Sequence, residues 1–208
     1  MLKLDRDHLR WNTIIIGAIR VRESDAQNHD RVKEISDQAA EMVNNFRRQW
    51  LGITRGRHLS GLVWRGVFEL ELKREVDPDG HHHATLESMG CDMTPLAPDE
   101  RYLIVHTHFV VAFPGELDGA ISADELRRVI QGVWTGKWQT QVKSLYANLR
   151  VEKSITNLYS YCYKNRLQYS TGGLGDVQVK YGNPYGWLWS RFVLNVYDSF
   201  TREFRSKR

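Results

Sequence analysis

The sequence predicts a domain in which β-strands and α-helices are mixed, and two kinds of pattern support this. Three apolar runs are typical of strands, at Trp11–Val21, Leu62–Glu75 and Tyr102–Pro114. Between and after these runs, apolar residues recur at helical spacing. With 208 residues, the chain is long enough to bury a sizeable core in one large domain.

The first strand and helix are predicted near the N-terminus. The strand Trp11–Val21 is rich in β-branched residues and stops at the polar run Arg22–Asp25. A helix is predicted from about Asp30, with Gly52 as its stop. Its apolar positions are Val32, Ile35, Ala39, Met42, Val43, Phe46 and Trp50. We expect this helix to serve packing.

The second strand, Leu62–Glu75, carries two acids on one face. Phe68 and Leu70 share a face, whereas Glu69 and Glu71 share the opposite one. Carboxylates on an otherwise apolar strand are costly unless they point to water or bind a cation. Two interpretations stay open, a half-exposed strand and an acidic metal ligand.

The third strand, Tyr102–Pro114, contains two histidines two residues apart. Because strand side chains alternate between faces, His106, His108 and Val110 share one face. Two imidazoles on one face of a central strand form a preformed pair of metal ligands. The alternative is a pair of core histidines, each satisfied by a hydrogen bond.

A turn-rich segment, 76–100, contains a second group of histidines. His81, His82 and His83 are consecutive, and Cys91 lies near them. Such a tract can bind metal. We favour a mobile connection between strands, because proline and glycine recur through the segment and prevent a long regular element.

Further elements follow the histidine strand. Ser122 and Glu125 form a capping box that opens a helix. Leu145–Val151 alternates apolar and polar residues, which predicts a strand. Ser154–Ser170 is predicted as a helix capped by Ser154, followed by a glycine-rich break. Trp187–Arg208 predicts an aromatic, basic closing helix.

Charge is unevenly distributed along the chain. From Lys137 to the C-terminus there are 12 Lys and Arg against 4 Asp and Glu, whereas the first 136 residues carry a net negative charge. A basic C-terminal third suits a phosphate backbone, and steep salt dependence of binding would follow.

Cysteine use and hydropathy exclude several classes of protein. Cys91 and Cys162 stand alone, so the sequence has no CxxC motif and no disulfide framework. No run approaches the roughly 18 apolar residues of a membrane span, and the N-terminus does not resemble a signal peptide. We therefore expect a cytoplasmic protein without membrane contact.

The helix after Ser154 has a polar face and an apolar face at about 100° per residue. The polar face consists of Asn157, Tyr161, Lys164 and Gln168. The apolar face consists of Ile155, Tyr159, Cys162 and Tyr163. Tyr161 is therefore a tyrosine on a polar face, one turn before a lysine.

Taken together, three ordered motifs resemble those of the HUH endonucleases, most closely the rolling-circle replication initiators. They are the acidic strand GVFELEL, the strand HTHFVVAF that begins at His106, and the helix motif YCYK at Tyr161–Lys164. The resemblance covers roughly Leu62–Gln168. Thr107 stands where the family usually has a hydrophobic residue.

The resemblance implies an α+β fold of the HUH, or ferredoxin-like, type. It implies a central antiparallel sheet with the H-x-H strand in the middle and helices packed on its faces. The endonuclease domain would span 1–170, with an N-terminal strand and helix in 1–60 and the catalytic core in 61–170. Residues 171–208 would be a basic aromatic extension packed on the same domain.

The resemblance also implies an activity, namely nicking of single-stranded or hairpin origin DNA by tyrosine attack, which initiates rolling-circle replication of a plasmid or phage. Tyr161 would be the nucleophile and Lys164 would neutralise charge. The implied ligands of one Mn²⁺ or Mg²⁺ are His106, His108 and Glu71, with Glu69 as the alternative acid. The predicted DNA-binding residues are Asn157, Gln168, Arg150 and Arg166. A host helicase and polymerase would act as partners, since no helicase motif follows.

Three alternatives stay open. A relaxase or transposase of the same fold would share the chemistry. A non-catalytic nucleic-acid-binding module would use the histidines structurally. A different metal-dependent hydrolase would use His106, His108 and Glu71 to activate a water molecule.

Overall fold

The computed structural model describes residues 6–55, 59, 61–73, 81–114, 119–163, 184–200 and 203–205. The strands are β1 (Leu9–Arg22), β2 (Val63–Lys73), β3 (Glu100–Ala112), β4 (Thr140–Ser144) and β5 (Glu203–Arg205). The helices are a short 3₁₀ turn η1 (Arg6–His8), α1 (Glu23–Gln27), α2 (His29–Thr54), α3 (His81–Ser88), α4 (Gly119–Val133), α5 (Val151–Tyr163) and α6 (Pro184–Tyr197).

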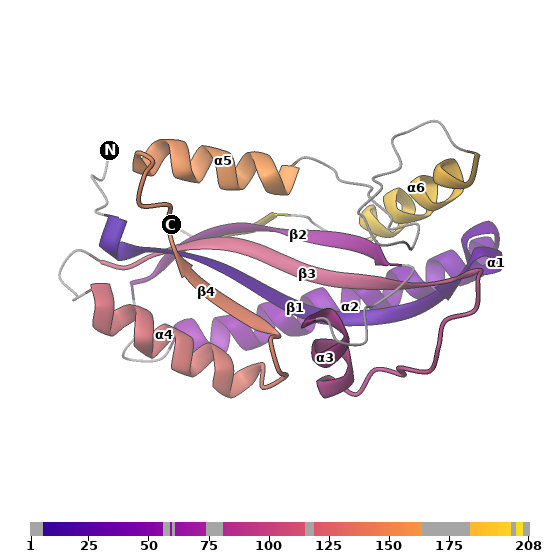
Figure 1. The fold of residues 1–208 in the computed structure, drawn as a ribbon, viewed down its shortest axis with the longest axis horizontal. Helices are drawn as coiled ribbons and strands as arrows, with labels where there is room; N and C mark the ends of the chain where they lie inside the picture. The colour runs from indigo at the N-terminus through magenta and orange to yellow at the C-terminus, as the bar shows by residue number, and fades with distance from the viewer. Residues whose placement is uncertain are drawn as a thin grey trace.

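The described strands form one antiparallel sheet in the order β4-β1-β3-β2-β5 (Figure 1). The α+β class with an antiparallel sheet is thereby confirmed. The histidine-bearing strand β3 lies in the middle, paired along its length with β1 and β2. Neighbours on both sides hold its backbone hydrogen bonds, so its side chains occupy fixed positions.

One face of the sheet carries the main apolar core. Figure 1 shows α2 and α4 on the side of the sheet opposite α5. From β3, Leu103, Val105, Phe109 and Val111 are fully buried in this core, together with apolar side chains of α2, α4 and α6. The opposite face carries two smaller apolar clusters, one under α5 and one beside α3.

Helix α2 shows why its sequence folds as predicted. The Asn28 side chain caps the helix by accepting hydrogen bonds from the backbone N–H groups of Asp30 and Arg31. Of the predicted apolar positions, all but the partly buried Met42 are buried. The helix continues past Gly52 to Thr54, so the predicted stop was wrong, since one glycine inside a long packed helix costs only about 1 kcal/mol.

Three predictions for the middle of the chain were wrong. No strand forms at 145–151; β4 lies just upstream at Thr140–Ser144, and α5 already begins at Val151, so that Ser154 is buried inside the helix. The apolar alternation arises because Leu145 and Val151 pack on one cluster from a turn and a helix start. Likewise, α4 begins at Gly119, so Ser122 lies within it rather than at its cap.

The segment with three consecutive histidines and the closing helix also differ from expectation. His81, His82 and His83 form the first turn of α3 rather than an irregular connection. The closing helix α6 ends at Tyr197, and β5 then pairs with β2 at Arg65–Val67. The predicted glycine-rich break and helix end at 164–183 lie outside the described residues.

Close approach of β2 and β3 depends on Gly66, which is opposite Phe109. A Cβ atom there would lie 2.2 Å from Cβ of Phe109 and 2.3 Å from the carbonyl oxygen of His108.

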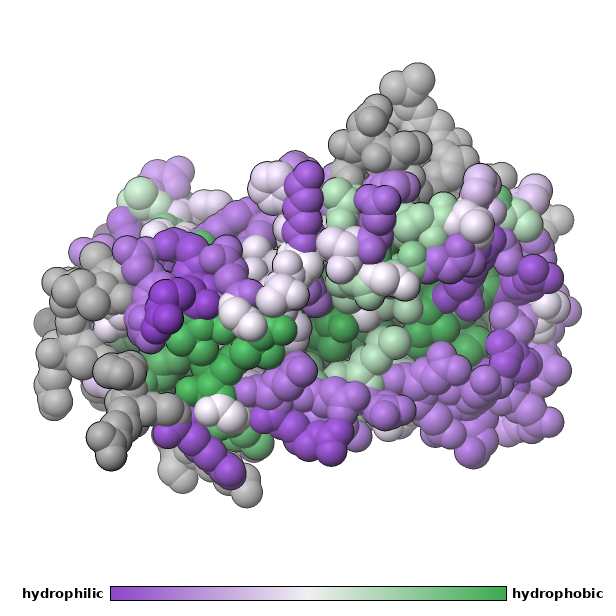
Figure 2. All heavy atoms as spheres, turned by 90° about the horizontal axis from the view of Figure 1, so that it is seen from below, coloured by the Kyte–Doolittle hydropathy of each residue, from purple (hydrophilic) through white to green (hydrophobic). Residues whose placement is uncertain are grey.

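Viewed from below, the molecule shows apolar side chains in a band between hydrophilic ones (Figure 2). In the described part of the chain, no helix is long and apolar enough to cross a membrane.

Candidate metal centre

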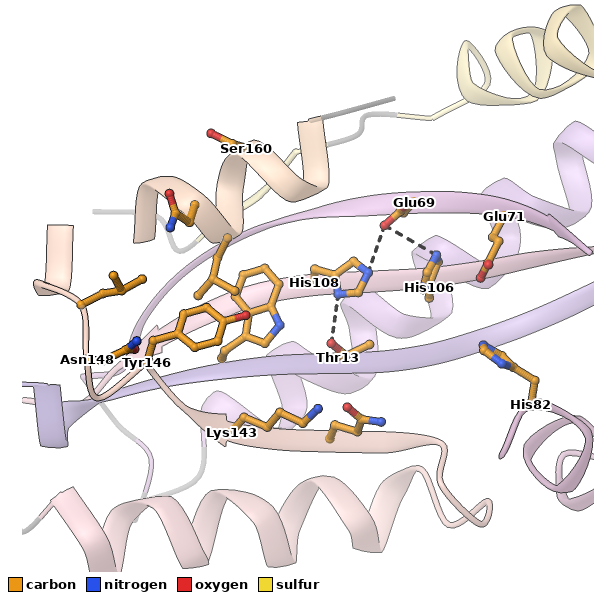
Figure 3. Close-up of a pocket in the computed structure, with 15 residues that line it drawn as sticks. Thr13, Glu69, Glu71, His82, His106, His108, Lys143, Tyr146, Asn148 and Ser160 are labelled. Atoms are coloured by element: carbon orange, nitrogen blue, oxygen red, sulfur yellow. Dashed lines mark hydrogen bonds and ion pairs between the residues drawn. The ribbon is translucent and has the colours of Figure 1, made fainter. Parts of the chain in front are cut away.

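Three side chains, one from β2 and two from β3, converge on the face of the sheet covered by α5. Oε2 of Glu69 lies 3.0 Å from Nε2 of His108 and 3.7 Å from Nε2 of His106 (Figure 3). One ligand atom from each residue lies within 4.8 Å of the others. Two atoms bound to one ion at about 2.1 Å lie about 3 Å apart at a right angle, so the group is close enough to hold a metal ion.

Strand register explains the convergence. Glu69 is the direct cross-strand partner of His106, and Val67 is the partner of His108. Because side chains alternate along each strand, Glu69, His106 and His108 point to the same face of the sheet. The alternation predicted from the sequence therefore produces the group once the register is set.

Burial keeps His106 neutral. Its side chain is 12 % exposed. Burial, and next the neighbouring His108, lower the pKa of His106 to about 3, although Glu69 acts in the opposite direction. Its Nε2 has no hydrogen-bond partner among the described residues. A neutral, buried imidazole nitrogen without a hydrogen bond is a suitable metal ligand, and a histidine serving only the core would have satisfied it.

Two residues of β1 orient His108. The hydroxyl of Thr13 is hydrogen bonded to Nδ1 of His108 at 2.9 Å. The Trp11 indole stacks on the imidazole, with ring centroids 5.6 Å apart. When Nδ1 is protonated and donates to Thr13, Nε2 is left as an acceptor facing Glu69. This is the arrangement in which a histidine binds a metal through Nε2.

Glu71, the acid first expected as the third ligand, lies outside the group in the described structure. It is opposite Ile104 and forms an ion pair with Lys73 at 3.4 Å. Nζ of Lys73 in turn lies 3.3 Å from Nδ1 of His82 on α3. Burial, and next the charge of Lys73, lower the pKa of His82. The alternative acid, Glu69, is the one that joins the two histidines.

A cavity of about 800 Å³ opens over the three residues and extends below α5 (Figure 3). Polar side chains dominate the rest of its lining. The lining residues beyond the group are Trp11, Thr13, Glu71, His82, Gln141, Lys143, Tyr146, Asn148, Leu149, Asn157, Leu158 and Ser160. With two carboxylates, three imidazoles, amides and a lysine in its lining, the cavity suits a polar ligand better than an apolar one.

The predicted residues after β4 divide into described and undescribed positions. Asn157 on α5 is exposed and lines the cavity, whereas Arg150 is exposed just before α5 and is not part of the lining. Position 161 belongs to α5. Lys164, Arg166 and Gln168 lie outside the described residues. Among the described residues, His81 and His83 belong to no group that could hold a metal ion.

Sequence reasoning missed Thr13, Trp11, Lys143 and Tyr146. The first two meet His108 only through the pairing of β1 with β3, and the others reach the cavity from β4 and the turn behind it. No spacing in the sequence signals such non-local pairings.

Comparison with protein-family models, with curated proteins and with solved structures finds no match for this chain.

Proposed function

We propose that this protein is a metal-dependent endonuclease of the HUH type that nicks single-stranded or hairpin DNA, as a rolling-circle replication initiator does. The observation that carries the proposal is the group of Glu69, His106 and His108 on β2 and β3, below helix α5, which contains position 161, the first residue of the sequence motif Y-x-x-K. A relaxase or transposase of the same fold would use the same group.

Helix geometry supports Tyr161 as the nucleophile. Asn157 and Leu158 both line the cavity over the metal centre. At 100° per residue, position 161 lies on the helix surface between those two positions and one turn further along. Positions 159 and 163 lie on the other side of Leu158. Of the three tyrosines, Tyr161 therefore suits attack within this cavity best.

The proposed reaction is a transesterification. The phenolic oxygen of Tyr161 forms a bond to phosphorus while the bond to the 3′-oxygen breaks, leaving a 5′-phosphotyrosine and a 3′-hydroxyl that takes up the proton. A bound Mn²⁺ or Mg²⁺ would supply Lewis-acid stabilisation of charge on the phosphoryl oxygens. Glu69, His106 and His108 would hold that ion, Thr13 would orient His108, and Lys164 would neutralise charge.

The test is the formation of a covalent protein–DNA adduct. The protein is incubated with Mn²⁺ and a randomised single-stranded DNA library that contains hairpins, and adducts are detected on a denaturing gel. We expect an adduct with the wild type and none with Tyr161→Phe, with the double variant His106→Ala/His108→Ala, or in the presence of EDTA. Tyr159→Phe and Tyr163→Phe serve as matched controls and should keep the adduct.

The other outcomes separate the alternatives. DNA fragments without an adduct would assign a hydrolase that activates water. A mobility shift without cleavage would assign a non-catalytic binding module. Normal adduct formation by His106→Ala/His108→Ala would contradict a metal-dependent nickase altogether.

A further inference from the structure

The outer strand β4 is flanked by two exposed aromatic side chains. Trp138 precedes the strand and is 52 % exposed, and Tyr146 follows it and is 54 % exposed. Between them, Gln141 and Lys143 are exposed and line the same cavity as the metal centre, as does Tyr146 (Figure 3). An aromatic–basic–aromatic strip thus follows this edge of the described sheet.

Trp138 is held in a strained backbone conformation. Its φ is 60°, and no other described residue except glycine has a positive φ. The turn is fixed around it, because the buried Gln139 side chain donates to the carbonyl of Ile15 at 2.9 Å. The Ser88 hydroxyl also accepts from the backbone N–H of Lys137 at 2.9 Å. Strain that points a large apolar side chain toward solvent indicates a binding role.

The strip is continuous with the cavity at the α3 end. The rings of Trp138 and His81 meet edge to face, with centroids 4.6 Å apart. The next residue, His82, lines the cavity (Figure 3). A ligand lying across Trp138 therefore reaches the cavity over His82 without crossing the rest of the surface.

The charge of the strip favours a polyanion. From Lys137 to Val151 the chain contains Lys137, Lys143 and Arg150, and no Asp or Glu. All three cations are exposed. Exposed aromatic rings combined with cations are typical of surfaces that bind single strands, where bases stack and phosphates are neutralised. A protein strand pairing with β4 would gain little from this combination.

We propose that single-stranded DNA lies along β4, with bases stacked on Trp138 and Tyr146 and a phosphate at Lys143, and enters the metal centre from there. The proposal deepens the proposed function and rests on it for the class of nucleic acid. Its test uses binding alone, in EDTA, so that its outcome is independent of cleavage.

The main experiment compares two properties of Trp138→Gly. Affinity for a fluorescein-labelled single strand of about 20 nucleotides is measured by fluorescence anisotropy, and we expect it to fall by about 5- to 150-fold, the range for loss of one stacked base. The midpoint of thermal unfolding should stay equal or rise, because glycine adopts a positive φ without strain. Trp138→Phe should keep most of the affinity.

Two further arms identify stacking and phosphate contact. Replacing the bases of the probe by abasic sites should weaken binding by the wild type far more than by Trp138→Gly with Tyr146→Ser. Lys143→Gln should lower the slope of log affinity against log salt by about 1, whereas Lys33→Gln, on α2 and 71 % exposed, should not change it.

Unchanged affinity in Trp138→Gly and in Tyr146→Ser would overturn the proposal. If Trp138→Gly fails to fold, Tyr146→Ser and Trp138→Phe still decide it, since the first must lose affinity and the second must keep it. Variants that abolish a dimer seen by sedimentation, but not DNA binding, would assign the edge to a second copy of the chain. Failure of the two proposals is distinguishable. Unchanged binding by the strip variants in EDTA would overturn the DNA path along β4, whereas absence of a covalent adduct with the wild type would overturn the nickase.

Discussion

The two faces of β3 differ in what surrounds them. On one face, Leu103, Val105 and Phe109 are fully buried in a continuous apolar core against α2, α4 and α6. On the other face, two small apolar clusters lie apart, and His106 and His108 lie on the strand between them. One strand therefore belongs both to the main core and to a polar cavity.

Because of this difference, one face of β3 contributes mainly to folding stability and the other carries the candidate metal ligands. The continuous core fixes the backbone of β3 and of both neighbouring strands, so the positions from which the two imidazoles project are set by the opposite face of the sheet. The polar group in turn interrupts the second face, which buries less apolar area. Substitutions on the two faces should therefore have opposite consequences for folding and for metal binding.

The largest expected difference is between two positions on opposite faces of β3. Phe109→Ala should lower the free energy of unfolding by about 3–5 kcal/mol, because it leaves a cavity in the main core. His106→Ala should cost much less, since its Nε2 makes no hydrogen bond in the described structure. Urea denaturation followed by circular dichroism measures both. Equal losses would show that the histidine face carries as much stability as the core.

A smaller effect is expected from glycines that face different surroundings. Gly66→Ala should cost at least about 1–3 kcal/mol, because the new Cβ would clash with backbone and Cβ atoms of β3. Gly52→Ala on α2 is the matched control, because no atom other than those of the adjacent residues and the nearby helix backbone lies within 4 Å of its Cβ position. It should stabilise the protein by about 0.5–1 kcal/mol. A Gly66→Ala variant as stable as the wild type would show that β2 and β3 can move apart to accommodate the new Cβ atom at no cost.

The contribution of Thr13 to metal binding through His108 should be measurable without a large effect on folding. Thr13→Val removes the hydrogen bond to Nδ1 of His108 while preserving side-chain shape. Affinity for Mn²⁺ should fall by about 10- to 100-fold. Calorimetric titration checks this, with Thr156→Val on the exposed side of α5 as control. Unaltered affinity would show that His108 is oriented by packing on Trp11 alone.

The smallest effect concerns acid stability at the start of β3. Hydrogen bonds, first from Arg20 and next from the backbone N–H of Ala97, lower the pKa of Glu100 from 4.5 to about 2. Because the folded-state pKa is depressed, the stabilisation is present above about pH 4.5 and is lost as pH falls toward 2. Glu100→Gln should flatten this part of the stability curve. An unchanged acid transition would contradict this role.

Local sequence patterns predicted β1, α2, β2 and β3, because alternation and helical spacing are properties of short segments. The same alternation predicted that His106 and His108 share a face with an acid of β2. It did not decide between Glu69 and Glu71, because both point to that face. The pairing of Glu69 with His106 is set by register, which depends on contacts distant in sequence.

The errors have a related cause. Strand β4 is largely exposed and its residues, TQVKS, alternate weakly, so its formation depends on pairing with β1. The apolar alternation nearby came from Leu145 and Val151, which pack on one cluster from a turn and a helix. Thr13 became visible as a partner of His108 only once β1 and β3 were paired.

The most direct test of the metal centre compares its two candidate acids. The protein freed of metal is titrated with Mn²⁺, and free Mn²⁺ is followed by its electron paramagnetic resonance signal, for the wild type, Glu69→Gln and Glu71→Gln. We predict one bound ion per chain in the wild type and in Glu71→Gln, and a loss of binding in Glu69→Gln. Binding that survives in Glu69→Gln, or that is absent from the wild type, would contradict a centre formed by Glu69, His106 and His108.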